Sequence, residues 1–269
     1  MNEFSEPVRL GRTGMMAGRL GIASSYGAPA AAYEEAFERG CNYFSVGTFL
    51  RGRSAGMIRA IRNIVKKGYR DRLIISLAEY THSRWPGRNH FLKGLKKLGI
   101  EYVDALMLGY YPRRPRTAVL DMATELREKQ LVRFVSLSGH HRRLFQELTD
   151  DGLIDIFHLR YNAVNRGAEK DVFPYLKKDG GPGIVAFTAT RWGQLLQQKR
   201  MPPGEQPLTA KDCYRFALSH PAVDICMTGT RDLEMMRENL ETLDSGPLSG
   251  EEMARIRRIG DHIYGKQRA

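Results

Sequence analysis

Short apolar runs alternate with longer amphipathic segments along the chain. The short runs are rich in β-branched residues or are continuously apolar, which is typical of strands buried on both faces of a parallel sheet. They predict strands at Arg19–Ser24, Cys41–Val46, Leu73–Ala78, Val103–Gly109, Val132–Ser138, Ile154–Tyr161, Gly183–Thr188 and Val223–Thr228. The segments between them repeat their apolar residues at helical spacing, so each strand is expected to be followed by a covering helix.

The expected helices are Ala30–Arg39, Ala55–Lys67, Arg88–Leu98, Ala118–Lys129, Arg142–Leu148, Ala168–Lys178, Thr209–Ser219 and Leu233–Leu243, with a terminal helix from Ser249 to about Tyr264. Strand and helix units of about 33 residues each favour an α/β fold of the (β/α)₈ TIM-barrel type. An open doubly wound sheet is the weaker interpretation. The segment Gly21-Ile-Ala-Ser-Ser-Tyr-Gly lacks the Gly-x-Gly-x-x-Gly turn expected after its first strand.

Before the first barrel strand, the glycine-rich stretch from Val8 to Gly21 predicts a β-hairpin. We expect this hairpin to plug the bottom of the barrel. With 269 residues and 42% apolar side chains, the chain is expected to form a single barrel domain over residues 1–269, including the hairpin plug and the C-terminal helix.

The N-terminal residues show no secretory pattern, and no apolar run approaches the length of a membrane span. Cys41, Cys213 and Cys226 lack the spacing of a disulfide framework or zinc site, so we interpret them as buried thiols. These features predict a cytoplasmic protein without a membrane partner or a metal. The net charge of +12 favours polyanions in general, including nucleotide phosphates and acidic surfaces. Charge alone motivates nucleic-acid binding, which we do not expect.

Five blocks of sequence are similar to segments of one known family and occur in the same order. They are Leu10-Gly-Arg-Thr-Gly with Arg19-Leu-Gly, Gly40-Cys-Asn-Tyr-Phe, Leu98-Gly-Ile-Glu-Tyr-Val-Asp, Tyr161-Asn-Ala-Val-Asn-Arg, and Gly229-Thr-Arg with Arg237-Glu-Asn-Leu. Together they resemble the aldo-keto reductase superfamily. Three further runs, beginning at Arg160, Thr188 and Asp212, resemble a divergent bacterial branch of it. The resemblance implies a TIM barrel that binds NADP(H) and descends from oxidoreductases.

The block from Gly229 to Arg231 also has a physical interpretation that does not need the family. Backbone N–H groups, a hydroxyl and a guanidinium would lie just before a helix, which is a good phosphate site. The resemblance implies that Thr230 and Arg231 hold the 2′-phosphate of NADP, while Glu238 and Asn239 face the adenine. The alternative is a helix capped by Asp232 with an exposed Arg231.

The resemblance also assigns residues around the nicotinamide. Phe187 would stack on the ring, and Thr188 would offer a hydroxyl to the pyrophosphate region. Ser138 matches the serine that helps to hold the carboxamide, and His158 stands where the family has a glutamine.

At the positions of the family's catalytic tetrad, this chain departs from the pattern. The resemblance places Ser45 at the aspartate, Leu50 at the tyrosine (or Phe49, if the loop shifts by one), Ala78 at the lysine and Gly109 at the histidine. None of these residues can deliver or tune the proton that carbonyl reduction requires. The expected activity is therefore atypical or weak.

Other residues near the predicted strand ends offer replacement chemistry. Tyr110 and His140 are the first candidates, although an aromatic lid over Pro112 and a helix-entry residue are the simpler interpretations. Arg160 and Arg191 should both lie at the upper rim. They would either accept an anionic ligand or pair with carboxylates such as Glu79 and Glu169.

Two functions from different classes follow. The first is an aldo-keto-reductase-like oxidoreductase scaffold that binds NADP(H) and acts on a small molecule that the sequence does not identify. The second is a non-catalytic barrel that senses a dinucleotide or binds a partner protein. Substrate, oligomeric state and the preference between NADP and NAD stay open.

Overall fold

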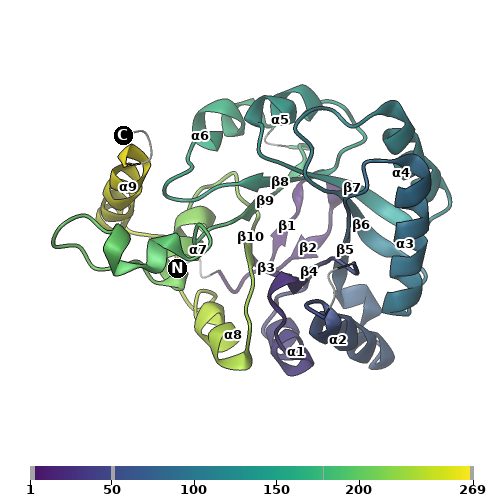
Figure 1. Cartoon of the computed structure of the whole chain (residues 1–269), viewed down its shortest axis with the longest axis horizontal. Coiled ribbons are helices and arrows are strands. Elements are labelled where there is room, and N and C mark those ends of the chain that lie inside the picture. Colours follow the sequence, from purple (N-terminus) through teal and green to yellow (C-terminus); the bar gives the residue numbers. More distant parts are fainter. Residues whose placement is uncertain (1–3, 50–51, 178, 267–269) are drawn as a thin grey trace.

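The predicted strands close into a barrel (Figure 1). The computed structural model describes residues 4–49, 52–177 and 179–266. Within these residues, eight parallel strands pair in the order β10-β3-β4-β5-β6-β7-β8-β9. They are β3 (Leu20–Ala23), β4 (Tyr43–Val46), β5 (Ile74–Glu79), β6 (Val103–Leu108), β7 (Val132–Gly139), β8 (Ile156–Arg160), β9 (Gly183–Phe187) and β10 (Ile225–Thr228). The predicted (β/α)₈ barrel is therefore confirmed.

Helices surround this barrel, and the C-terminal helix lies outside the ring beyond α7 (Figure 1). The helices are α1 (Ala30–Glu38), α2 (Ala55–Lys66), α3 (Arg84–Leu98), α4 (Thr117–Glu128), α5 (Arg142–Leu148), α6 (Ala168–Asp171), α7 (Ala210–Leu218), α8 (Leu233–Leu240) and α9 (Gly250–Gly265). Most predicted bounds agree with these to within one or two residues.

Three predicted helices were wrong at one end by three or more residues, and two of these errors involve proline. The third is the helix predicted over Leu233–Leu243, which ends at Leu240. The helix predicted over Ala168–Lys178 ends at Asp171 and is followed by a short 3₁₀ turn, Phe173–Tyr175. Pro174 lacks a backbone N–H and restricts the preceding residue, so it interrupts the α-helix; Lys178 lies outside the described residues. Conversely, α3 begins at Arg84 rather than Arg88. Pro86 is tolerated there because N–H groups in a first turn have no helical partner.

Side chains of the strands alternate between the barrel interior and the helices. One buried cluster contains a residue from each of several strands, including Tyr43, Ile74 and Ile156, together with Leu10 and Met15 of the hairpin. The hairpin strands are β1 (Val8–Arg9) and β2 (Met16–Ala17). Because its side chains close the interior from below, the hairpin is the predicted plug.

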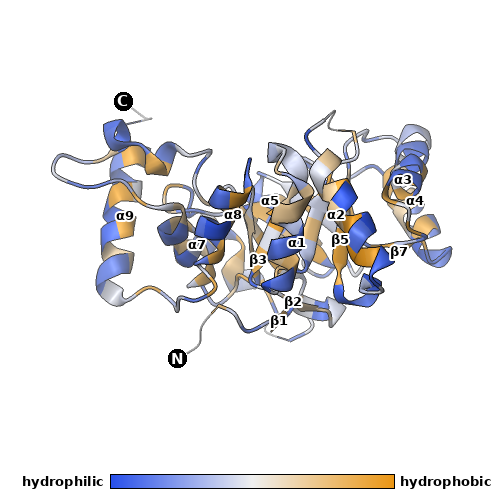
Figure 2. Cartoon of the chain, turned by 90° about the horizontal axis from the view of Figure 1, so that it is seen from below, coloured by the Kyte–Doolittle hydropathy of each residue, from blue (hydrophilic) through white to orange (hydrophobic). Residues whose placement is uncertain are grey.

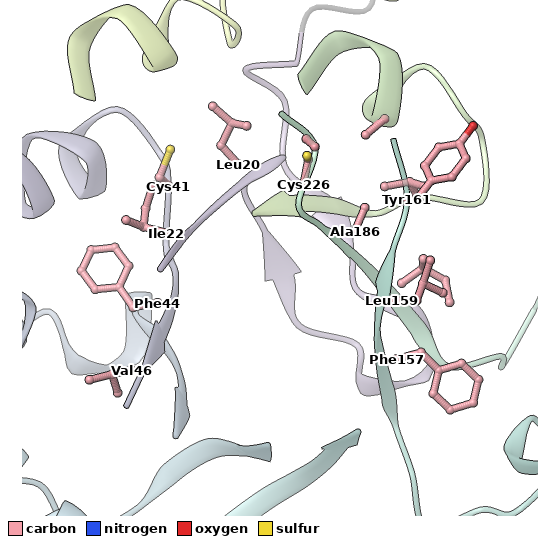
Figure 3. Close-up of a cluster of buried hydrophobic side chains, with 14 of the residues drawn as sticks. Leu20, Ile22, Cys41, Phe44, Val46, Phe157, Leu159, Tyr161, Ala186 and Cys226 are labelled. Atoms are coloured by element: carbon pink, nitrogen blue, oxygen red, sulfur yellow. The ribbon is translucent and has the colours of Figure 1, made fainter. Parts of the chain in front are cut away.

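The second cluster faces the helices and is larger. Figure 3 shows Leu20, Ile22, Phe44, Phe157 and Leu159 projecting from their strands into it. The alternation follows from the two-residue period of a strand: a barrel strand is covered on both faces, and each face must be apolar.

Each covering helix buries one face only. In α2, for example, Met57, Ile61 and Ile64 are buried at three- and four-residue spacing, whereas Arg59 is exposed. Figure 2 accordingly shows hydrophobic and hydrophilic residues on the same helices, α2 and α9 among them. Among the helices of the described residues, none has the length and apolar character that a membrane crossing requires.

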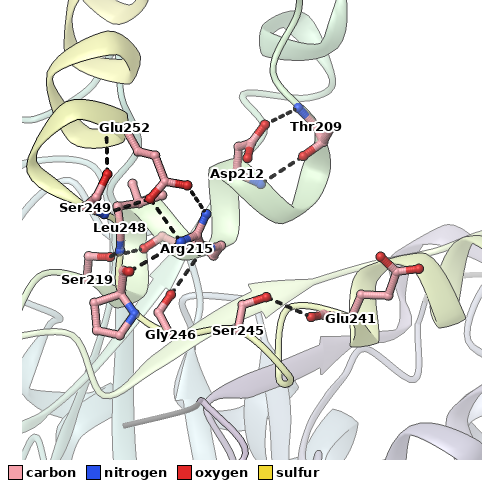
Figure 4. A network of polar contacts seen from close by, with 11 residues as sticks. Thr209, Asp212, Arg215, Ser219, Glu241, Ser245, Gly246, Leu248, Ser249 and Glu252 are labelled. Atoms are coloured by element: carbon pink, nitrogen blue, oxygen red, sulfur yellow. Dashed lines mark hydrogen bonds and ion pairs between the residues drawn. The ribbon is translucent and has the colours of Figure 1, made fainter. Parts of the chain in front are cut away.

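The outer helix α9 is attached to α7 by a polar network (Figure 4). The guanidinium of Arg215 on α7 binds the carboxylate of Glu252 on α9, with the shorter contact at 2.6 Å, and its Nε donates to the carbonyl of Gly246 at 3.1 Å. Ser249 caps α9 by accepting from the backbone N–H of Glu252. One arginine therefore fixes both the helix and the loop that leads into it.

Three aspartates make the same kind of hydrogen bond at the amino ends of strands. Each accepts a backbone N–H from the preceding strand of the barrel: Asp104 from Ile75 at 2.9 Å, Asp155 from Val135 at 2.9 Å, and Asp224 from Ile184 at 2.8 Å. Each also lies near an arginine, and the guanidinium of Arg70 is 2.9 Å from Asp104. These pairs satisfy N–H groups that the ladder leaves open at the floor of the barrel.

Asp224 should make stability depend on pH. Burial raises the pKa of its carboxyl from 3.8 to about 6, partly opposed by the hydrogen bond from Ile184 and the charge of Arg19. Between these values the folded state holds a proton that the unfolded state has lost, so the contribution of Asp224 falls as pH rises from about 4 to about 6. We expect Asp224→Asn to remove a decrease of about 2 kcal/mol across that range.

The measurement is urea unfolding of both proteins at several pH values. The Asn side chain keeps an acceptor for the N–H of Ile184, so the comparison isolates the titration. A free energy difference between the two proteins that does not change with pH would contradict the assignment.

Candidate active site at the carboxyl end of the barrel

Three of the four residues predicted to occupy tetrad positions lie around the mouth of the barrel, where the strands end. Ser45 and Ala78 have the same parity along their strands as the interior residues Tyr43 and Ile74, so both face inward. Gly109 follows β6 directly. Leu50 lies outside the described residues. No ionisable side chain stands at the three described positions.

The place of a side chain at Gly109 is taken by Tyr80. A Cβ atom built on Gly109 would lie 2.5–2.6 Å from three atoms of the Tyr80 ring. This ring also meets Phe49 edge-to-face, with centroids 5.5 Å apart. Burial raises the pKa of the Tyr80 phenol, so the hydroxyl remains protonated at neutral pH. Tyr80 therefore fills the space that a histidine would need, and is itself a weak acid.

Tyr110 and His140, the two replacement candidates, lie next to each other. Their rings meet at 78° with centroids 5.2 Å apart, and His140 also contacts Phe187 at 5.5 Å. Burial, followed by the positive charges of Arg160 and His141, lowers the pKa of His140, so its imidazole is neutral at pH 7. Its Nδ1 is buried and has no hydrogen-bond partner. A neutral imidazole whose Nδ1 makes no hydrogen bond with the described residues can accept a proton. It lies beside Phe187, the residue predicted to stack on the nicotinamide.

Ser138 and His158 are paired in register across β7 and β8. His158 is buried, and its Nε2 lies 2.7 Å from the hydroxyl of Tyr43. Burial lowers the pKa of His158 to about 3, so the ring is neutral. A carboxamide that binds Nε2 of His158 would have to displace this contact with Tyr43. Ser138 is only partly buried.

The loop after β10 is covered by an aromatic ring. It also carries a hydroxyl without a hydrogen-bond partner and a guanidinium without an ion pair among the described residues. The ring of Tyr26 lies over Gly229, because a Cβ there would be 2.2 Å from the ring. Thr230 is fully buried, yet its Oγ1 has no hydrogen-bond partner among the residues that the structure describes. Arg231 is exposed and makes no ion pair with the described residues. Gly229 is thus the residue that permits Tyr26 to approach the loop backbone.

The helix behind this loop is capped by its own sequence. The carboxylate of Asp232 accepts from the N–H of Met235 at 2.8 Å, which is the arrangement of the simpler interpretation. Arg231 and Glu238 are exposed. The first turn of α8 therefore already carries a negative charge, and the guanidinium of Arg231 is the positive charge of this loop that could attract a phosphate.

Asn239 has a structural contact. It is buried, and its Nδ2 donates to Oγ1 of Thr228 at 2.9 Å; that hydroxyl in turn donates to Tyr214 at 2.7 Å. These bonds hold α8 against β10 and α7. In this arrangement the Asn239 side chain faces the protein interior, while Glu238 beside it is open to solvent.

The segment after β9 has an unusual backbone. Thr188, Arg191 and Trp192 all have positive φ, at 62°, 52° and 53°. Such angles cost of order 1 kcal/mol or more for residues with a Cβ, and they cluster at functional sites. Asn162 stabilises the segment, since its Nδ2 donates to the carbonyl of Thr188 at 2.9 Å.

Two residues of the mouth were missed in the sequence. Tyr26 covers Gly229, and Trp192 is 61% exposed. Both follow the carboxyl end of a predicted strand, so a survey of aromatic residues at those ends would have found them. Contact between Tyr26 and Gly229 joins the first and last strands of the barrel, which no local pattern indicates.

A model of the aldo/keto reductase family matches residues 14–212, well over half of the chain. No curated protein matches the sequence. Among solved structures, an aldo-keto reductase from Bacillus halodurans in its holo form has a TM-score of 0.77 at 17% identity, covering 94% of this chain and 96% of that one.

An aldo/keto reductase from Klebsiella pneumoniae, solved with NADP and acetate, has a TM-score of 0.75 at 18% identity, covering 94% of this chain and 95% of that one. A thermostable aldo-keto reductase, solved with the inhibitor epalrestat, has a TM-score of 0.74 at 23% identity and covers 94% and 99%. These similarities concern the fold. Because the family model spans most of the barrel described above, the chain belongs to the aldo/keto reductase family.

Proposed function

We propose that this protein binds NADP(H) at the mouth of its barrel and is an oxidoreductase with weak or atypical activity. The proposal rests on the contrast between two groups of residues at the mouth of the barrel. The loop from Gly229 to Arg231 keeps groups suited to a dinucleotide, whereas Ser45, Ala78 and Gly109 supply no proton. The Klebsiella pneumoniae relatives solved with NADP or NADPH support the choice of cofactor.

The residues of the loop fit a dinucleotide in part. The buried, unpartnered Oγ1 of Thr230 and the free guanidinium of Arg231 would bind phosphate oxygens. Phe187 would contact the nicotinamide, with Thr188 beside the pyrophosphate and Ser138 at the carboxamide. The bound cofactor would supply the hydride. Asp232 at the start of α8 opposes a phosphate there, so the preference for NADP over NAD depends on Arg231.

Proton delivery is the step that this chain supports least. Tyr110 and His140 lie beside Phe187 and are the described groups best placed to replace the lost acid. His140 is neutral at pH 7 and Tyr110 is exposed. We therefore expect any reduction to be slow, and its rate to depend on these two residues.

The same contrast favours a second function from another class. A barrel that keeps its dinucleotide loop but lacks an acid could report cofactor occupancy to a partner without turnover. NADPH binding combined with no reduction across a panel of carbonyl compounds, and a partner that co-purifies only with NADPH present, would support this function.

Isothermal titration with NADPH and NADH tests the proposal. In Arg231→Ala, we expect NADPH to bind about 10- to 100-fold more weakly, consistent with loss of a charge-assisted contact of about 1.5 to 3 kcal/mol. NADH, which lacks the 2′-phosphate, should change by less than about threefold.

The matched control is Arg59→Ala, which removes the same charge from the exposed face of α2. It should leave both affinities unchanged. If neither dinucleotide binds the wild-type protein, the proposed function is wrong.

A further inference from the structure

Two arginines at the mouth of the barrel have no acidic partner in the part of the chain that the structure describes. Arg160 ends β8, has the inward parity of His158, and is paired in register with Phe187 on β9. Arg191 lies in the loop after β9 and is only 8% exposed. Its guanidinium donates to Oε1 of Gln194 at 2.7 Å, while its Nε is buried without a partner. We call Arg160 and Arg191 the arginine corner.

The acids that could neutralise the arginine corner are engaged elsewhere. Glu169 binds Arg257 at 2.7 Å and accepts from the hydroxyl of Tyr161 at 2.6 Å. Glu79 accepts from the backbone and hydroxyl of Thr81 at 2.9 and 3.0 Å. Among the described residues, no carboxylate forms an ion pair with either arginine of the corner. The alternative in which these arginines only balance Glu79 and Glu169 is therefore wrong.

Arg191 lies in the loop that begins after Phe187, the register partner of Arg160, so both arginines belong to the same part of the rim. Burial, followed by the charges of Arg160 and then Arg200, lowers the pKa of Arg191. The positive φ of Arg191 adds backbone strain in a segment of three such residues. Like charges that are partly withdrawn from water destabilise a fold unless a counter-charge joins them. A bound anion would supply the missing counter-charge and would explain why the fold keeps this arrangement.

Aromatic rings line the same part of the mouth. His140 contacts Phe187, and Tyr110 contacts His140 from the other side. His140 and Arg160 also border a cavity of about 10 Å³, which is room for one water molecule. A ligand in the mouth would therefore meet flat apolar surfaces beside two cations.

We propose that the arginine corner binds the anionic group, a phosphate or carboxylate, of a small substrate whose planar part lies against Tyr110 and His140. Arginine suits this task because its planar guanidinium offers paired donors to both kinds of oxyanion. As a statement about a substrate, this inference rests on the proposed function. As a statement about anion binding, it can be tested without any dinucleotide.

The test is titration of the wild-type protein with phenyl phosphate, followed by intrinsic fluorescence, since the exposed Trp192 adjoins Arg191. We expect Arg160→Gln and Arg191→Gln each to weaken binding by about 10- to 100-fold. Arg59→Gln is the matched control and should bind as the wild type does. Thermal unfolding of each variant establishes that the variant is folded. If Arg191→Gln does not fold, the comparison of Arg160→Gln with the wild type decides the result. Equal affinity in the wild type and both corner variants would overturn the proposal.

A second arm separates a substrate from the pyrophosphate of the dinucleotide, which offers the same chemistry. Phenyl phosphate should bind to protein saturated with NADPH, and the corner variants should weaken NADPH by less than about threefold. If NADPH competes with phenyl phosphate and is itself weakened in both variants, the corner belongs to the cofactor and the proposal is wrong. If NADPH does not bind at all, but phenyl phosphate binds the wild type and binds both corner variants more weakly, the proposed function is wrong and the anion site is still supported.

Discussion

Reduction of simple aldehydes by this protein with NADPH should proceed with a turnover number on the order of 10⁻³ s⁻¹ or lower, against about 10 s⁻¹ for a typical enzyme. A positioned general acid contributes about 10²- to 10⁴-fold, and donors to the developing oxyanion contribute about 10²- to 10³-fold. Ala78 and Gly109 provide neither, and the hydroxyl of Ser45 is too weak an acid to serve as the general acid. Binding of the two reactants in one mouth would still give a measurable rate above that in water.

Steady-state loss of NADPH absorbance with a panel of aldehydes and ketones measures this rate. Planar carbonyl compounds that carry a carboxylate or phosphate belong in the panel, because they match the arginine corner. A turnover number near 10 s⁻¹ with any of them would contradict the prediction.

Variants identify the acid if such a rate is found. Tyr110→Phe and His140→Ala remove the two leading candidates, and Tyr80→Phe removes the phenol that covers Gly109. Tyr175→Phe, an exposed tyrosine in the 3₁₀ turn after α6, is the control and should leave the rate unchanged. A rate that falls in one variant alone would assign the proton to that residue.

Asp104→Ala should lower the free energy of unfolding by about 3–5 kcal/mol, which is a large share of the stability of a typical domain. The carboxylate is 2% exposed and is 2.9 Å from the guanidinium of Arg70 and 3.1 Å from that of Arg133. It also accepts the N–H of Ile75. Its removal leaves a largely buried arginine without a counter-charge and a strand N–H without an acceptor.

Urea unfolding followed by circular dichroism measures this loss. Asp244→Ala is the control, since Asp244 pairs with Arg39 at 2.7 Å on the surface, and it should cost less than about 1 kcal/mol. Equal costs for the two variants would mean that the buried aspartate gives no net stabilisation to the barrel floor.

The strands were predictable because each must be apolar on both faces, and such runs are visible in the sequence. The closed barrel followed from the repeat of strand and helix units, and the hairpin plug from the glycine-rich stretch before the first strand. The end of α6 at Asp171 was not anticipated, although Pro174 is a local signal that should have shortened the prediction. The start of α3 was missed for the opposite reason, since a proline is tolerated in the first turn.

At the site, the sequence predicted which side chains are substituted, and the structure shows what surrounds those positions. Gly109 was predicted to be a substitution, but the ring of Tyr80 over it was not predicted. Likewise, Asn239 had the residue type of an adenine contact, whereas its amide binds Thr228 in the interior. Side-chain direction depends on packing between helices and strands, so residue type alone did not predict these contacts.

By itself, the sequence determined the class of fold and the number of strand and helix units, because hydrophobic periodicity is a local property, and it motivated the prediction that the tetrad positions lack proton donors. Only the tertiary structure decided that Tyr80 covers Gly109, that Tyr26 covers Gly229, and that Arg160 and Arg191 share one corner without an acid. Those relations join residues tens to hundreds of positions apart. They arise when closure of the barrel brings the ends of all its strands to one face.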